Sequence, residues 1–252
     1  MTVVLITNDD GIESPGLHAL AHAALDEGFE VVIAAPEAEA SGSSASIIGA
    51  EIDGHIHMKR REIAGLDVPS YAVRAAPALI ALIAAHGAFG AAPEAVLSGI
   101  NRGANIGHAI LHSGTVGAAL TGGSSGARGL AVSLDVGMNP ATHEWVAAAE
   151  LTRRLLGELV ASPPGTVLNL NVPNDARAGE LTPRLATLAP FGIVQTTTVA
   201  EAGEAGVRLT VADLAGEHDP RSDAALLAGG QPTLTAITAV REAPEPTGTS
   251  SR

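Results

Sequence analysis

The segment that sets the architecture reads Val3-Val4-Leu5-Ile6-Thr7-Asn8-Asp9-Asp10-Gly11. Its apolar half is rich in β-branched side chains and predicts a buried strand. The strand runs directly into two adjacent acids, and ligands of open parallel sheets bind beyond the carboxyl ends of the strands. Because two carboxylates placed there repel each other, we expect a cation to share the site, with a hard divalent metal as the leading candidate. The alternative is an Asn-Asp-Asp-Gly turn with a purely local role.

Length, composition and charge narrow the class of protein. The 252 residues suffice for one large α/β domain or two small ones. Hydrophobic residues make up 46% of the chain but aromatic residues only 2%, so the core must consist of Ala, Val, Leu and Ile. The net charge of −13, with Lys59 as the single lysine, argues against a nucleic-acid polymer as partner. It does not exclude a small phosphorylated substrate whose charge a metal can offset.

Several classes of site and location are disfavoured by the sequence. Cysteine is absent, which excludes disulfides, thiolate chemistry and Cys-ligated zinc. The nine histidines do not form a zinc pattern, and no Gly-x-Ser-x-Gly nucleophile motif occurs. No signal-peptide pattern precedes the first strand, and the most apolar run, 75–92, is interrupted by a proline and two glycines. We therefore expect a soluble, cytoplasmic protein with no membrane partner.

Strand and helix patterns alternate along most of the chain. Strands are expected at Phe29–Ala35, Tyr71–Arg74, Ala95–Ser98, Leu130–Leu134 and Val167–Val172, with helices near 17–25, 78–85, 116–125 and 142–160. This alternation predicts a doubly wound parallel α/β sheet. After about residue 180 only short strand-like pieces follow. We therefore expect a catalytic core over 1–180, a β-rich C-terminal arm over 181–241 and a disordered tail over 242–252.

A glycine-rich segment follows the strand expected at Ala95–Ser98. It reads Ser98-Gly99-Ile100-Asn101-Arg102-Gly103-Ala104-Asn105-Ile106-Gly107. Its glycines leave backbone N–H groups accessible to an anion, and its two asparagines offer amide oxygens for a metal and amide donors for phosphate. The spacing matches neither the phosphate-binding loop of nucleotide-binding ATPases nor the dinucleotide fingerprint. An anion or metal loop and a purely structural loop both remain open.

Two serine-containing segments are further candidates. Ser113-Gly114-Thr115 opens an Ala-rich helix, where Ser and Thr are usually plain N-caps but where helix N-termini also bind phosphate. The loop over residues 35–44 follows the second predicted strand, and the Ser41 hydroxyl could reach a metal held by Asp9 and Asp10. By itself that loop is equally typical of ordinary surface structure.

Taken together, these motifs resemble the SurE family of metal-dependent nucleotidases and acid phosphatases. The resemblance extends from residue 1 to about 175 and keeps the family order. It rests on the segments Thr7-Asn8-Asp9-Asp10-Gly11, Ser14-Pro15-Gly16, Ala35-Pro36 with Ser41-Gly42, Ser98-Gly99-Ile100-Asn101 with Asn105, Ser113-Gly114-Thr115-Val116 and Leu168-Asn169-Leu170-Asn171-Val172-Pro173.

The resemblance implies a Rossmann-like fold and a site assignment. One divalent cation, usually magnesium or manganese and alternatively calcium in crystals, would be held by Asp9, Asp10, Ser41 and Asn101. The two acids would also be the catalytic residues, and the phosphate pocket would comprise Asn105, Ser113, Gly114 and Thr115. The implied reaction is hydrolysis of nucleoside 5′-monophosphates, with 3′-monophosphates and other monoesters as further substrates. A C-terminal arm exchanged between subunits would make a homodimer or homotetramer.

The sequence departs from the family most strongly near its C-terminus. The aromatic-rich segment of the family is reduced to residues 204–213 without Trp or Tyr. Because aromatic rings commonly stack on nucleobases, base recognition is the property most in question. One alternative is therefore a catalytically weakened homologue that binds nucleotides as a sensor. A phosphoryl-accepting receiver domain is disfavoured, because no lysine follows Lys59.

Overall fold

The computed structural model describes residues 1–49, 51–52, 54–137, 140–190, 194–201, 204–211, 219–238, 240 and 242. Six parallel strands form the centre of its main sheet. They are β1 (Val3–Thr7), β2 (Glu30–Pro36), β6 (Ser70–Val73), β7 (Ala95–Arg102), β8 (Arg128–Asp135) and β9 (Val167–Pro173). Their order in space is β9-β8-β7-β1-β2-β6, which confirms the predicted doubly wound parallel sheet.

The strand order reverses between β1 and β7. From β1 the chain adds β2 and β6 on one side, and it then crosses to add β7, β8 and β9 on the other. Ligands of open α/β sheets bind at such a reversal, beyond the carboxyl ends of the two strands. The fold therefore directs attention to the loop that follows β1 and to the end of β7.

Antiparallel strands extend the sheet at both edges. β5 (Met58–Arg60) pairs with β6, and β13 (Thr233–Ile237) pairs with β9. β10 (Arg184–Leu185) lies outside β13 and runs parallel to it. A small separate hairpin is formed by β3 (Glu51–Ile52) and β4 (His55–Ile56).

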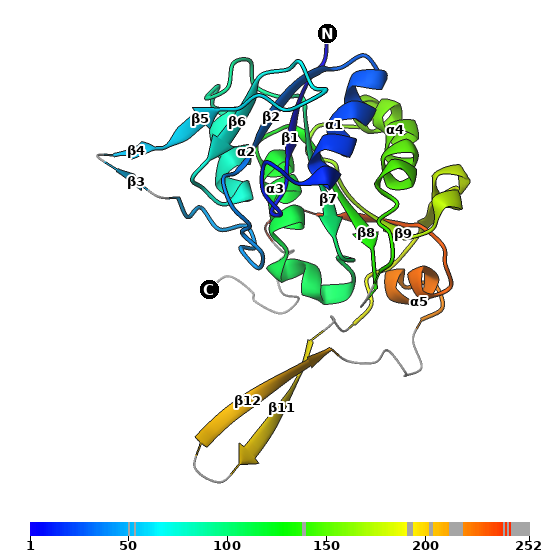
Figure 1. Cartoon of the computed structure of the whole chain (residues 1–252). Coiled ribbons are helices and arrows are strands. Elements are labelled where there is room, and N and C mark those ends of the chain that lie inside the picture. Colours follow the sequence, from blue (N-terminus) through cyan, green and yellow to red (C-terminus); the bar gives the residue numbers. More distant parts are fainter. Residues whose placement is uncertain are drawn as a thin grey trace, which may run out of the picture.

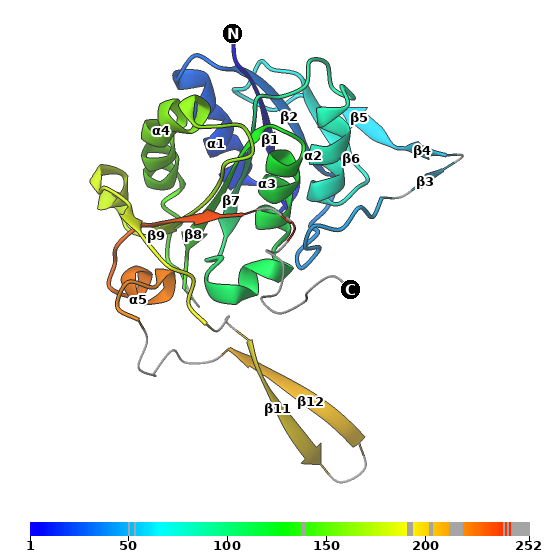
Figure 2. The same cartoon turned by 180° about the vertical axis from the view of Figure 1, so that it is seen from behind.

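Two pairs of helices cover the two faces of the sheet. On one face lie α1 (Pro15–Asp26) and α4 (Trp145–Ala161), as Figure 1 shows. On the other face lie α2 (Pro77–Ala85) and α3 (Gly114–Ser124), which come to the front in Figure 2. The core between these layers consists of Ala, Val, Leu and Ile, as the composition predicts. The apolar run over 75–92 supplies the buried helix α2.

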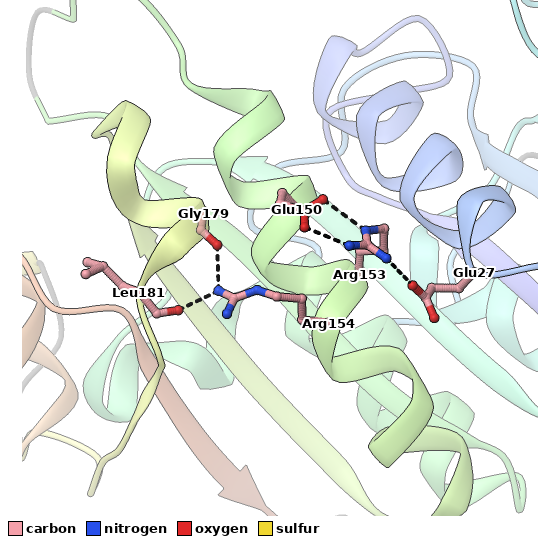
Figure 3. A network of polar contacts seen from close by, with 6 residues as sticks. All are labelled: Glu27, Glu150, Arg153, Arg154, Gly179 and Leu181. Atoms are coloured by element: carbon pink, nitrogen blue, oxygen red, sulfur yellow. Dashed lines mark hydrogen bonds and ion pairs between the residues drawn. The ribbon is translucent and has the colours of Figure 1, made fainter.

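Arginines of α4 tie this helix to its neighbours (Figure 3). The Arg153 guanidinium forms ion pairs with Glu150 on the same helix and with Glu27 at the end of α1. The Arg154 guanidinium donates to the backbone carbonyls of Gly179 and Leu181, which lie at the end of the 3₁₀ helix η2 (Ala176–Glu180) and just after it. These exposed pairs contribute little to stability individually. They link α4 to α1 and to the end of η2, while the buried face of α4 packs in the core.

The described parts of the predicted arm, 181–241, pair in two different sheets. β11 (Val194–Glu201) and β12 (Glu204–Val211) form an antiparallel hairpin that extends away from the main sheet (Figures 1 and 2). The later part returns to the body as α5 (Asp223–Ala228) and β13. The reason is that β9 would otherwise leave an unpaired edge, and β13 covers it along five residue pairs. Of the tail predicted over 242–252, only Glu242 lies within the described residues.

No helix in the described part of the chain has both the length and the apolar character needed to cross a membrane.

Candidate active site

Three loops meet beyond the carboxyl ends of β7, β1 and β2, which are neighbours in the sheet. Asp9 and Asp10 follow β1, Ser41 lies in the loop after β2, and Asn101 lies near the end of β7. All four line one cavity of about 950 Å³. The structure thus brings together the complete set of residues predicted to hold a metal.

The segment after β1 forms a turn and also points two acids toward this cavity. The Asn8 side chain closes the turn, because its Oδ1 accepts from Gly11 N and its Nδ2 donates to Gly11 O, both at 3.1 Å. Asn8 is fully buried. The turn and the metal site were predicted as alternatives for this segment. In the structure Asn8 and Gly11 close the turn, while Asp9 and Asp10 line the cavity.

Asp9 is held by a residue far away in the sequence. Asp9 is 6% exposed, and its Oδ1 accepts a hydrogen bond of 2.6 Å from the Thr115 hydroxyl. Burial raises the pKa of the Asp9 carboxyl, and the hydrogen bond from Thr115 opposes that rise. The side chain is consequently fixed in orientation while its charge is only partly compensated.

Asp10 is more exposed than Asp9 and forms a hydrogen bond with the end of β7. Its Oδ2 accepts a hydrogen bond of 3.2 Å from the backbone N–H of Arg102. Burial, followed by the charge of Asp9, raises the pKa of Asp10 to about 6, and the Arg102 N–H opposes this rise. The pKa values of both neighbouring carboxyl groups stay raised although the charge of Arg102 also lowers that of Asp10, so the positive charge at the site does not fully compensate the two acids.

Ser41 and Asn101 each keep an oxygen near these acids. The Ser41 hydroxyl donates to Glu39 Oε1 at 2.6 Å. The Asn101 Nδ2 donates to Gly103 O at 2.8 Å, whereas its Oδ1 bonds to no described residue. That orientation leaves the amide oxygen of Asn101 available as a ligand.

The strand that carries Asn101 is longer than predicted. β7 was expected to end at Ser98, but it continues to Arg102 after a shift of its register with β8 between Ser98 and Asn101. Gly99 permits this shift, because its φ is +139° and a Cβ there would lie 2.3 Å from Val132 O. Irregularities of this kind re-aim side chains next to active sites. Asn101 therefore stands on the sheet itself rather than on a loose loop.

Asn105 is anchored by the two neighbouring strands. Its backbone N–H donates to Asn171 Oδ1, and its carbonyl accepts from the amides of Asn169 and Asn171. Its own Nδ2 donates to Ser133 Oγ at 2.8 Å. One N–H and the amide oxygen of Asn105 bond to no described residue and remain free for a ligand. Because Asn105 lines the cavity, it is rigidly placed there.

The three residues predicted at the start of α3 take different positions. Ser113 lines the cavity, and its hydroxyl caps α3 by accepting from Val116 N at 3.1 Å. Gly114 leaves no room for a side chain, since a Cβ would lie 2.5 Å from Ser43 Oγ and 2.8 Å from Asp9 Oδ2. The Thr115 side chain is fully buried and its hydroxyl is committed to Asp9. In this structure Thr115 positions an acid, and a direct phosphate contact of its hydroxyl stays a prediction.

Sequence reasoning missed several residues that line the same cavity. They are Glu39, Arg102, His108 and His112. Glu39 and Arg102 are sequence neighbours of Ser41 and Asn101, which is the only signal that could have identified them. His108 and His112 lie on the unpredicted 3₁₀ helix η1 (Gly107–His112), where the glycine-rich pattern suggested loop.

The donor set fits a hard divalent cation. Two carboxyl groups, one hydroxyl and one free amide oxygen face a common cavity, and such cations prefer oxygen ligands. Within the described chain, no three His, Asp or Glu side chains are grouped as a metal site. The oxygens of Ser41 and Asn101 are therefore needed to complete the set.

Comparisons with known proteins identify the family of this chain. The family model described as survival protein SurE matches residues 4–190. The protein 5′-nucleotidase SurE of Symbiobacterium thermophilum is 41% identical over 177 residues, which are 69% of this chain and 66% of that protein. Its namesake from Xanthomonas campestris pv. campestris is 37% identical over 180 residues, covering 71% and 66%. The chain thus spans 66% of the length of these curated relatives.

A solved structure shows the same fold. The crystal structure of the SurE protein from Aquifex aeolicus superposes with a TM-score of 0.74, at 24% identity, over 94% of this chain and 93% of that one. The family match covers well over half of the chain, including every residue that was predicted to form the site. The chain therefore belongs to the survival protein SurE family.

Proposed function

We propose that this chain is a phosphomonoesterase that hydrolyses nucleoside 5′-monophosphates to nucleoside and phosphate. Nucleoside 3′-monophosphates and other phosphate monoesters are proposed as further substrates. One observation carries the proposal: two acids, two amide side chains and the start of α3 line a single cavity at the reversal of the strand order. The names of the curated relatives support the same activity.

The cation is proposed to be Mg²⁺ or Mn²⁺, held by Asp9, Asp10, Ser41 and Asn101. When bound, it supplies the positive charge that withdraws electron density from the phosphoryl group. Asp9 needs no rearrangement for this role, because Thr115 already fixes its carboxyl. The Asn101 side chain needs no rearrangement either. Its Nδ2 donates to Gly103 O, so its amide oxygen is left as the ligand atom.

The phosphate is proposed to lie between Asn105 and the N-terminus of α3. The free N–H groups of a helix start favour an anion, and Ser113, the N-cap of α3, lines the cavity. Asn105 adds an amide donor whose position is set by β8 and β9. Such preorganised donors stabilise charge that develops on the phosphoryl oxygens.

The attacking water is proposed to be oriented by Asp10. Only the Oδ2 of Asp10 bonds to a described residue, so its second oxygen can accept a proton from water. The water oxygen then forms the new bond to phosphorus, the ester P–O bond breaks, and the departing nucleoside oxygen takes up a proton from solvent water. Asp9 is less suited to this role, because it is more deeply buried and already accepts from Thr115.

A homodimer or homotetramer is proposed for the intact protein. The hairpin β11–β12 supports this, because it extends from the body as an exchanged arm would (Figure 1). The cytoplasmic location expected from the sequence stays a prediction.

Activity with and without metal tests the proposed function. Purified protein should release phosphate from nucleoside monophosphates in Mg²⁺ or Mn²⁺ and lose that activity in excess chelator. Asp9→Asn should lower kcat/KM by roughly 100-fold or more, because it removes a ligand charge from a preorganised site. Glu158→Gln changes an exposed acid of α4 and serves as the matched control. Turnover that persists in chelator, or an unimpaired Asp9→Asn variant, would contradict the proposal.

A further inference from the structure

A second, smaller cavity adjoins the proposed active site. Its volume is about 310 Å³, and it is lined by Asp10, Ser14, Pro15, Glu39, Arg102, His143 and Trp145. Asp10, Glu39 and Arg102 line both cavities, so the two share a wall. A volume of about 300 Å³ lies at the lower end of the range for small-molecule sites. This cavity can accept part of a ligand whose other end lies at Asp10.

The far side of this small cavity carries an aromatic pair. The rings of His143 and Trp145 are stacked, with centroids 5.3 Å apart and an interplanar angle of 8°. Trp145 is the only tryptophan in a chain that is 2% aromatic. Among the described residues that line the two cavities, Trp145 at the start of α4 therefore offers the largest π-surface.

The aromatic pair is rigidly mounted. Asn174, which directly follows β9, accepts from Glu144 N and donates to Thr142 O, both at 2.8 Å. These two bonds hold the segment before α4 to the end of a sheet strand. Trp145 itself packs against the core, and its Cζ3 would lie 3.2 Å from a Cβ placed on Gly16. A ring surface that is fixed in this way binds a ligand at low entropic cost.

We propose that the cavity beside Trp145 and His143 receives the purine or pyrimidine ring of the nucleotide. The inference rests on the proposed function, which places the phosphate on the other side of Asp10 and Arg102. Because every base offers a π-face, stacking here favours nucleotides over aliphatic esters without a strong preference among bases.

Kinetics with two substrates test the subsite. Trp145→Ala and His143→Ala should each lower kcat/KM for adenosine 5′-monophosphate about tenfold more than kcat/KM for glycerol phosphate, which has no ring. Trp145→Phe keeps an aromatic ring and should restore most of the preference. Val146→Ala is the matched control, because Val146 is exposed, next in sequence and outside the cavity. The exposed position of His143 keeps the test valid if Trp145→Ala fails to fold.

Fluorescence gives a readout that needs no turnover. With one tryptophan in the chain, emission excited at the red edge of its absorption reports on Trp145 alone. Adenosine should change this emission in a saturable manner, and inorganic phosphate should not. His143→Ala should weaken the apparent affinity for adenosine.

The outcomes separate the two proposals. If no ester is hydrolysed but adenosine still titrates the Trp145 emission, the proposed function fails and the subsite stands. If esters are hydrolysed but both alanine variants lose activity equally on the two substrates, or adenosine leaves the emission unchanged, the subsite is overturned.

Discussion

At the scale of single residues, the site combines buried acids with few compensating charges. Asp9 and Asp10 are adjacent, and burial raises the pKa of each. Within the protein this cost is offset in part by hydrogen bonds from the Thr115 hydroxyl and the Arg102 backbone, and at Asp10 also by the charge of Arg102. An acid with a raised pKa favours folding when it is protonated and opposes folding when it is ionised. The same acids that bind a cation therefore weaken the metal-free fold.

Asp10→Asn should reveal this cost through its pH dependence. The pKa of Asp10 rises from 3.8 to about 6, so its contribution to stability is fully present below pH about 4 and is lost as the pH rises through 6. In chelator at pH 7, urea unfolding should show Asp10→Asn to be more stable than the parent, and this difference should vanish near pH 4. Added Mg²⁺ should stabilise the parent far more than the variant. A variant less stable than the metal-free parent at pH 7 would show that the ionised Asp10 is well compensated.

At the scale of elements, the cavity wall is held by carboxyl and amide side chains from distant strands and helices. The Asp223 carboxyl at the start of α5 is fully buried. It accepts from Gly107 N at 2.8 Å, from Ala189 N at 2.9 Å and from Ala224 N at 2.8 Å. Gly107 begins η1, which carries His108 and His112 on the cavity wall. The C-terminal part of the chain thus positions part of the active-site wall.

Asp223→Asn should loosen that wall. An amide cannot accept with its nitrogen, so one of the buried N–H groups loses its partner at a cost of about 1–3 kcal/mol in the free energy of unfolding. We expect this loss in urea unfolding, together with a raised KM for nucleoside monophosphates and a smaller change in kcat. Asp219→Asn, at an exposed acid paired with Arg221, is the matched control. A destabilised Asp223→Asn variant with unchanged KM would show that Asp223 supports the fold without positioning the site.

At the scale of the whole molecule, one part of the chain lies outside the layered body. The hairpin β11–β12 pairs only with itself over eight residue pairs, whereas α5 and β13 return to the sheet. Figures 1 and 2 show the hairpin extending on the side of α5, away from the central strands. An extended two-stranded hairpin is marginally stable by itself in water. Contact with another subunit is a direct way to stabilise it.

Replacing residues 194–211 with a short Gly-Ser linker should therefore change the oligomeric state. Light scattering should show a dimer or tetramer for the full chain and a monomer for the shortened one, while thermal unfolding of the body stays cooperative. The replaced segment lies outside the main sheet, so the replacement leaves the strand pairing of the main sheet unchanged. An unchanged molecular mass after the replacement, or a monomeric full chain, would contradict the exchange of this arm.

Much of the fold was predictable because it follows from local patterns. Apolar runs such as Val3–Ile6 and their alternation with helical spacing predicted the parallel sheet, and strand ends predicted where Asp9, Asp10 and Ser41 lie. The extension of β7 to Arg102 was not predictable, since it depends on how Gly99 packs against Val132. The pairing of β13 with β9 is likewise a contact between distant segments that no local pattern specifies.

The sequence by itself determined the doubly wound sheet, the edge at which a ligand is proposed to bind and the oxygen-rich character of the predicted metal site. These properties follow from periodicity and from residues that lie within a few positions of a strand end. Only the tertiary structure decided that Thr115 holds Asp9, that Asp223 holds Gly107, and that Trp145 and His143 lie beside Asp10. Each of these contacts joins residues that are about one hundred or more positions distant in the sequence. Only the stacking of the His143 and Trp145 rings on each other is local. Such contacts depend on how helices and strands pack, which no local pattern specifies.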